Sequence, residues 1–169
     1  MFTMCWYFNK DIARKIEDAK TLDHFLFGND WYRYLYVDGK YISCTNEKMV
    51  QDHVNNHTYA RWQGKGTLYG ITRYSFMAVS NDDWFNSNIL LTHFRTIYAR
   101  MTELSLVQRA SILKFSNEVT HLSRLPEAKL EKLSDNIGNF YKEYIRFVNQ
   151  VFFREVSSQE QGIELYNML

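Results

Sequence analysis

Apolar residues recur at helical spacing through the last third of the chain. They step by three and four residues, at Leu130, Leu133, Ile137, Phe140, Tyr144, Phe147 and Val151. This repeat is typical of a helix that packs along one seam. Pro126 suits the first turn of such a helix, and the sequence predicts a helix over 127–169. The register continues through polar Arg154, Ser158 and Gln161 and then reaches Leu165 and Met168.

The segment before this proline predicts another long helix, from about Trp84 to Leu122. Asn81, Asp82 and Asp83 precede it, and residues of these types cap helix N-termini and favour the positive end of the helix dipole. Apolar residues follow at spacings of three and four, at Phe94, Ile97, Met101 and Leu104. We expect this helix and the last one to pack as an antiparallel pair, which accounts for the apolar seam as far as Val151.

Short runs of aromatic and β-branched residues occupy the first half of the chain. Two of them, 31–37 and 40–45, flank Asp38-Gly39, and this arrangement predicts a β-hairpin. A third run, 67–80, contains no proline and predicts a central strand.

Two short helices are expected beside these strands, over 11–27 and from a cap at Asn46 to about Asn55. Most of the seven glycines also lie in this half, at Gly28, Gly39, Gly64, Gly66 and Gly70, so it is richer in turns than the second half. The sequence therefore predicts an α+β fold. A mixed α/β subdomain over 1–82 is followed by a subdomain of long antiparallel helices over 83–169.

The amino-acid composition excludes some classes of function but does not identify one. The chain has 169 residues, with 20 basic and 19 acidic side chains, so its net charge is +1. A dedicated duplex-DNA binder normally carries a clear basic excess, and we expect no nucleic-acid partner. Hydrophobic residues make up 46% of the chain, which excludes intrinsic disorder. No run of 18 uncharged apolar residues is present, so we expect a soluble polypeptide.

Few residues are arranged for covalent or metal chemistry. Cys5 and Cys44 form no CxxC motif and are interpreted as thiols in a reducing cytoplasm. His53 and His57, at i and i+4, could share a metal on a helix, but a surface turn is the simpler interpretation. Gln63-Gly-Lys-Gly66 lacks the rest of a phosphate loop and precedes a strand. We therefore predict that the chain is not an enzyme.

One strand-forming region leaves a different class of function open. It interleaves basic and aromatic residues, at Arg61, Trp62, Lys65, Tyr69, Arg73, Tyr74 and Phe76. Aromatic side chains on a sheet can stack the bases of single-stranded RNA. A packed sheet with solvated basic positions explains the same pattern.

Two helical segments, Tyr98–Val119 and Tyr144–Tyr166, resemble the cytoplasmic helices of CorA-like divalent-cation transporters. The order of an α/β region followed by long antiparallel helices is also similar, and the resemblance covers about 67–169. The family's Gly-Met-Asn motif and both of its membrane helices are absent from this sequence. The resemblance therefore implies the cytosolic domain alone, at the cytoplasmic side of the cell membrane, with the membrane segments beyond Leu169.

This resemblance implies a homopentamer that binds Mg²⁺ between subunits and holds the pore closed while the cation is bound. The family's acidic ligands come from the N-terminal domain and from a long helix. The candidates here are Asp82 and Asp83 in the first region and Glu118 and Glu155 on helices, although none of them matches a family motif. Cation sensing and gating of a magnesium transporter is the function that follows.

The alternative is a stand-alone soluble helical module that binds other proteins and has no transport role. It predicts that Leu169 lies at or near the natural end of the chain. Both hypotheses are supported by the apolar seam, which extends beyond the helix predicted over 84–122. Such a seam indicates that further helices pack against it. Those helices come from a later part of the chain or from identical subunits.

Overall fold

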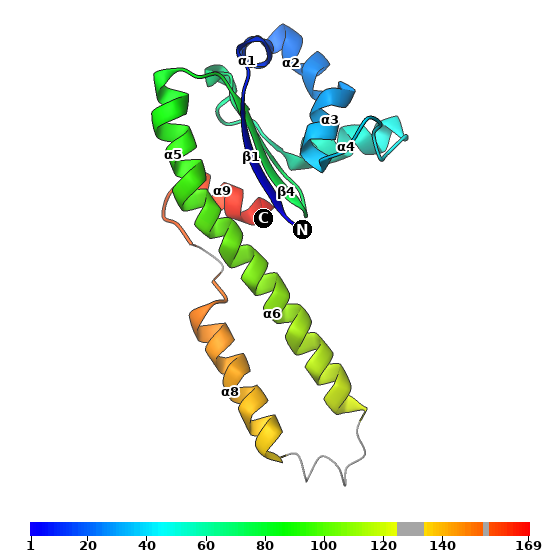
Figure 1. The fold of residues 1–169 in the computed structure, drawn as a ribbon, viewed down its shortest axis with the longest axis vertical. Helices are drawn as coiled ribbons and strands as arrows, with labels where there is room; N and C mark the ends of the chain where they lie inside the picture. The colour runs from blue at the N-terminus through cyan, green and yellow to red at the C-terminus, as the bar shows by residue number, and fades with distance from the viewer. Residues whose placement is uncertain (125–133, 154–155) are drawn as a thin grey trace. The chain divides into compact units, whose positions relative to one another are not determined.

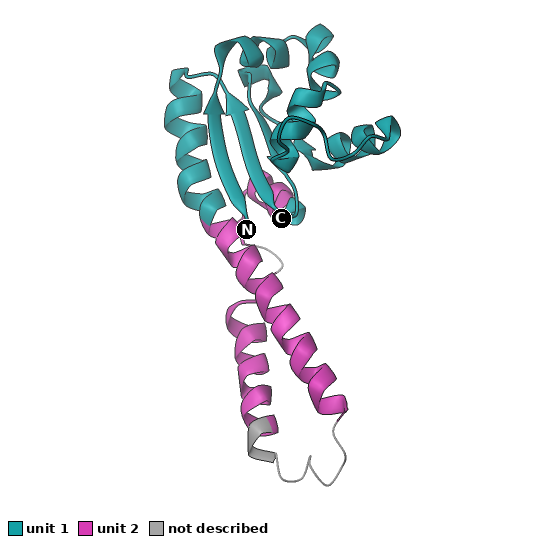
Figure 2. Cartoon of the chain, turned by 45° about the vertical axis from the view of Figure 1, so that its right-hand side comes forward, with its two compact units in different colours: residues 1–99, 167–169 teal, residues 100–166 magenta. Residues whose placement is uncertain are grey.

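The computed structural model describes residues 1–124, 134–153 and 156–169, and it has the expected α+β fold (Figure 1). The chain forms two compact units, one of residues 1–99 with 167–169 and one of residues 100–166 (Figure 2). The division between them falls later in the chain than the expected boundary at 82–83. We call the first the sheet unit and the second the helical unit.

A four-stranded mixed sheet forms the centre of the sheet unit, in the order β1-β4-β3-β2. Its strands are β1 (Thr3–Phe8), β2 (Thr58–Tyr59), β3 (Leu68–Ile71) and β4 (Ser75–Ser80). Strand β1 runs parallel to β4, whereas β3 is antiparallel to both β4 and β2. The prediction of one strand over 67–80 is wrong in detail, because the chain turns between Ile71 and Ser75. Strand β1 was not expected.

Five short helical segments connect or flank these strands. They are α1 (Lys10–Glu17), α2 (Ala19–Leu26), α3 (Asn29–Tyr36), α4 (Glu47–His57) and the 3₁₀ turn η1 (Gln63–Lys65). The expected helix over 11–27 is divided at Asp18, whose side chain accepts a hydrogen bond from the amide of Lys20 and so caps α2. The Asn46 cap is confirmed, since its Oδ1 accepts from the amide of Met49 at 3.0 Å.

The predicted hairpin at Asp38-Gly39 is wrong. The first of its arms is helix α3, which buries Trp31, Tyr32 and Leu35, and 40–45 forms neither helix nor strand. Strand propensity depends strongly on packing context, and here burial of one helical face against the core decides the structure. The turn signal marks the end of this helix instead, where Val37 adopts the left-handed conformation with φ 56°.

Helices cover both faces of the sheet (Figure 1). On one face α1, α3 and α4 pack on the strands through a buried cluster of Ile16, Trp31, Tyr32, Leu35, Val50, Val54, Leu68 and Val79. Gly70 of β3 lies so close to this layer that a Cβ atom there would collide with Leu35. On the other face Phe94 packs against Phe76 and Trp6, with ring centroids 4.9 and 5.3 Å apart. The sheet is therefore buried on both sides.

The helix that carries Phe94 confirms the prediction that began at Trp84. It runs through the π-helical turns η2 (Asn86–Leu90) and η3 (Phe94–Tyr98), with α5 (Leu91–His93) between them, and continues into α6 (Ala99–Ser123). Its start is capped by Asp83, whose Oδ1 accepts from the amide of Asn86 at 2.7 Å.

The helical unit contains α6 from Arg100 onward, α8 (Ser134–Gln150) and most of α9 (Glu160–Met168). The prediction of one unbroken helix over 127–169 is wrong, because α8 ends at Gln150 and the chain is not helical from 156 to 159. Seam positions Leu130, Leu133 and Arg154, and the start at Pro126, lie outside the described residues.

Polar contacts replace helical hydrogen bonds where α8 ends. The side-chain amide of Gln108, on α6, donates to the carbonyls of Val151 and Phe153 at 2.8 and 3.3 Å. The hydroxyl of Tyr166 donates to the Oε1 of Gln108 and to the carbonyl of Phe153, each at 3.0 Å. The carbonyls that a longer helix would use are thus satisfied by side chains, which allows the chain to leave the helical path.

Candidate docking groove of the helical unit

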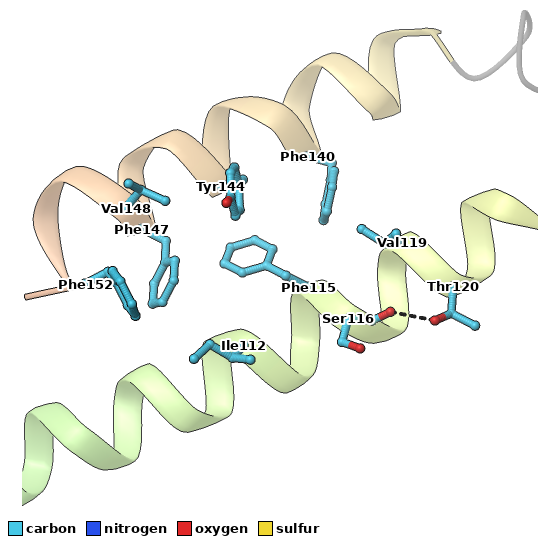
Figure 3. A pocket seen from close by; sticks show the side chains of 10 residues that line it. All are labelled: Ile112, Phe115, Ser116, Val119, Thr120, Phe140, Tyr144, Phe147, Val148 and Phe152. Atoms are coloured by element: carbon cyan, nitrogen blue, oxygen red, sulfur yellow. Dashed lines mark hydrogen bonds between the residues drawn. The ribbon is translucent and has the colours of Figure 1, made fainter.

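A groove of about 720 Å³ lies between α6 and α8 (Figure 3). From α6 it is lined by Ile112, Phe115, Ser116, Val119 and Thr120. From α8 and the residues after it, the lining is Phe140, Tyr144, Phe147, Val148 and Phe152. Among these residues none is charged, so the groove offers a surface for apolar groups.

Phe115 forms the floor of the groove and joins the two helices. Its ring centroid lies 5.6 Å from that of Phe140, 5.5 Å from that of Tyr144 and 5.3 Å from that of Phe147. Aromatic pairs at such distances each stabilise packing by about 0.5–1.5 kcal/mol beyond the burial of area. Of these four rings only Phe147 is buried. The predicted antiparallel pair is therefore present, with its seam partly uncovered.

The hairpin of α6 and α8 has two chemically different sides. Successive residues of a helix are about 100° apart, so Lys114 and Ser116 lie on opposite sides of Phe115. On the side of Lys114, its Nζ pairs with the Oε2 of Glu143 at 2.9 Å across the two helices. This contact lowers the pKa of the Glu143 carboxyl and raises the pKa of the Lys114 ammonium. The charged side therefore has its own link between the helices.

The groove side carries exposed apolar residues, which we call the open face. Its members are Ile112, Val119, Tyr141, Ile145, Val148 and Phe152, and each is between 39% and 62% exposed. The polar group of Thr120 is satisfied within its own helix, since its hydroxyl donates to the carbonyl of Ser116 at 2.8 Å. Small-molecule sites usually add a few polar groups that fix orientation. The open face has the character of a surface for a helix.

The acidic residues expected to bind Mg²⁺ have other contacts or lie apart. Asp82 pairs with the Nζ of Lys10 at 3.2 Å, and Asp83 caps the helix that follows it. Glu118 is exposed on α6, and Glu155 lies outside the described residues. In the described part of the chain, no three side chains of His, Cys, Asp or Glu are grouped closely enough to hold a metal.

The two histidines of α4 belong to an aromatic cluster. Helix α4 extends through His57, so it does not end at Asn55 as the surface-turn interpretation assumed. The ring centroids of His53 and His57 are 6.3 Å apart, and both rings contact Tyr36. The Nδ1 of His57 lies 2.7 Å from the carbonyl oxygen of Ile71. One ring nitrogen of His57 is therefore already used in a contact with the main chain.

Two aromatic residues of the basic and aromatic strand region are packed in the core. Tyr69 and Phe76 are fully buried beneath the helix that carries Phe94. Gly66 ends the η1 turn in the left-handed conformation, with φ 63°, and β3 follows it. The Nζ of Lys65 lies 5.6 Å from the centre of the Phe85 ring. The packed-sheet interpretation thus accounts for the strand aromatics.

No family model, curated protein or solved structure matches this chain. Within the residues that the structure describes, none of the helices is long and apolar enough to cross a membrane. The sequence predicted the seam at Phe140, Tyr144 and Phe147 but not the open face. The signal was present in the apolar residues at 141, 145 and 148, which lie beside the seam on the same helix.

Proposed function

We propose that this chain is a protein-interaction module that associates through its open face. The observation that carries the proposal is the division of the α6–α8 hairpin into an apolar and a charged side. An amphipathic hairpin of two helices leaves its apolar side in water unless a further layer covers it. The expected result of covering it is a helical bundle.

The occupant that we propose is the open face of a second copy of this chain. Because the open face holds no charged residue, two copies meet without burying an unpaired charge. The chain's net charge of +1 adds little repulsion. A two-fold axis would bring the aromatic seam of each hairpin against the other and would form a four-helix bundle.

The test is sedimentation velocity on the whole chain between about 5 and 200 μM, a range that brackets a micromolar Kd. We expect a dimer that Val119→Glu converts to a monomer, because an interfacial carboxylate would be buried without a partner. Val107→Glu is the matched control. Val107 is 50% exposed and Val119 is 53% exposed on the same helix, but Val107 lies on the side of Lys114.

Two results would contradict the proposal. One is a wild-type chain that stays monomeric at the highest concentration. The other is equal dissociation by Val119→Glu and Val107→Glu, which would place the interface elsewhere. Circular dichroism of each variant shows whether its helices are intact.

A cytosolic cation-sensing domain of a CorA-like transporter remains a second proposal. The order of an α/β unit and a long antiparallel helix pair supports it, together with the sequence resemblance. The C-terminal helix gives no support, since α8 ends at Gln150 and does not extend beyond its partner. The melting temperature with and without Mg²⁺ tests this proposal, using wild type, Asp82→Asn and Glu118→Gln. A stabilisation by Mg²⁺ that either substitution removes is expected, and identical melting in all samples would exclude sensing by these residues.

A further inference from the structure

Strand β1 is an edge of the sheet with an unpaired row of main-chain groups. The amides of Thr3 and Asn9 donate to carbonyls of the 74–80 segment, each at 2.8 Å. Because strand residues alternate in direction, the main-chain groups of the even-numbered residues 4, 6 and 8 point away from the sheet. In the described part of the chain, these groups have no main-chain hydrogen-bond partner.

This edge lacks the devices that usually protect an exposed strand. Strand β1 is six residues long and contains neither a charged residue nor proline. Protected edges are short, charged, bulged, interrupted by proline or covered by a helix or loop. The end of β1 is open to solvent, since Tyr7 is 47% and Phe8 41% exposed. An unprotected edge can accept another strand by main-chain hydrogen bonds, as in β-augmentation.

A groove of about 420 Å³ runs beside the same edge, wholly within the sheet unit. Its lining includes Met4, Trp6, Phe8, Leu91, Phe94 and Arg95. Side chains of the three β1 residues thus form one wall and the helix that follows β4 forms the other. A strand added to β1 would direct alternate side chains into this groove.

Arg95 gives the groove a charge preference. Its guanidinium is the single charged group of the groove lining and is exposed. Among the described residues it has no ion-pair or hydrogen-bond partner. A carboxylate on an added strand would pair with it at the rim of the apolar wall.

We propose that β1 and its groove bind an extended peptide segment of a partner protein, with apolar residues at alternate positions and an acidic residue for Arg95. A second copy of β1 fits less well, since its residues carry no carboxylate. This site is separate from the open face, and its test does not depend on dimer formation there.

The experiment is selection of peptides from a random octapeptide library on the immobilised whole chain. We expect selected peptides to alternate apolar residues and to carry Asp or Glu. Binding of the best peptide is then measured by fluorescence polarisation. Arg95→Glu is expected to weaken it about tenfold and to favour the same peptide with Lys in place of its acid. Arg100→Glu, on an exposed arginine further along the helix, is the control and should leave binding unchanged.

Phe8→Pro tests the strand addition itself. It removes an amide that points away from the sheet and leaves the hydrogen bonds to β4 in place, but it also removes the Phe8 side chain from the groove wall. We expect loss of peptide binding with unchanged circular dichroism, and a smaller loss for the control Phe8→Ala, which removes the same side chain and keeps the amide. Met4→Pro is the second variant if the first fails to fold. No enrichment, or equal binding by wild type and both proline variants, would overturn the proposal. So would a wild-type dimer that Phe8→Pro dissociates and Val119→Glu does not, because a second copy would then occupy the edge.

Discussion

The sheet unit and the helical unit use the same aromatic chemistry and differ in how completely they bury it. Phe76 of the sheet is fully buried and Phe94 is 5% exposed. In the helical unit Tyr144 is 45% exposed, although its ring centroid lies 5.5 Å from that of Phe115, close to the 4.9 and 5.3 Å that separate Phe94 from Phe76 and Trp6. A sheet with helices on both faces has two covering layers, whereas a pair of helices has none beyond itself. The aromatic side chains of the helical unit are thus more exposed because fewer layers of structure cover them.

The largest expected effect of this difference comes from truncating one phenylalanine in each unit. Phe76→Ala should lower the free energy of unfolding of the sheet unit by about 3–5 kcal/mol, since it leaves a cavity in a packed core. Phe140→Ala should cost much less in folding, because its ring is only half-buried, and should weaken association instead. Urea denaturation followed by circular dichroism measures the first effect, and sedimentation measures the second. Equal losses of folding stability would contradict the comparison.

The second largest effect is expected at high pH, which should lower the free energy of unfolding of the sheet unit. Burial raises the pKa of Tyr36 to about 12, and burial also raises the pKa of Tyr34 and Tyr69 above the ordinary tyrosine value. The unfolded chain then loses these protons at lower pH than the folded chain. The contribution of these tyrosines to stability is therefore fully present below pH about 10, the pKa of tyrosine in the unfolded chain. It is lost as the pH rises through their pKa values in the folded chain.

The measurement is denaturant unfolding at a series of alkaline pH values, with the tyrosinate absorbance recorded in parallel. Tyr34→Phe removes one titrating group and should reduce the alkaline loss of stability. It also removes the hydrogen bond from the Tyr34 hydroxyl to the carbonyl of Ala78, 2.9 Å long, so the comparison is made on the slope against pH. A slope identical to that of the wild type would contradict the role of this burial.

The sequence predicted most elements that are determined by neighbouring residues. It predicted fewer of those that are determined by packing between distant parts of the chain. The helix from Trp84 and the cap at Asn46 were correct, because capping and helical spacing act within a few residues. The hairpin at Asp38-Gly39 failed, since the strand preference of aromatic residues depends on packing context and a helix buries Trp31, Tyr32 and Leu35 here. Strand β1 was missed because its pairing partner, β4, lies far away in the chain.

The candidate site likewise has one part that the sequence predicts and another part that it does not. The seam of α8 follows from spacing alone, but the open face requires knowledge of which side α6 covers. Tyr141 and Val148 have no local signal that distinguishes an exposed apolar residue from a buried one. The end of α8 at Gln150 also depends on a residue of another helix, Gln108, which no pattern around position 150 indicates.

Removing that contact has a smaller expected effect, confined to the helical unit. Gln108→Ala leaves the carbonyl of Val151 without its side-chain donor and the carbonyl of Phe153 with the Tyr166 hydroxyl alone. It also removes one partner of that hydroxyl, the Oε1 of Gln108. We expect a loss of about 1 kcal/mol, typical of a partly buried hydrogen bond. Hydrogen exchange should show faster exchange at the end of α8 and in α9. Gln150→Ala, at an exposed position, is the control, and equal exchange in both variants would contradict this account.

The smallest effect is expected at the ion pair of Lys114 and Glu143. Both groups are exposed, and exposed pairs contribute little to stability because water and salt screen them. Lys114→Gln should therefore leave the melting temperature nearly unchanged. It should also leave association unchanged, because Lys114 lies on the side of the hairpin away from the open face. Sedimentation of this variant beside Val119→Glu is the sharpest comparison of the two sides. If Lys114→Gln dissociated the dimer and Val119→Glu did not, the charged side would be the interface, and the uncovered aromatic seam would need another explanation.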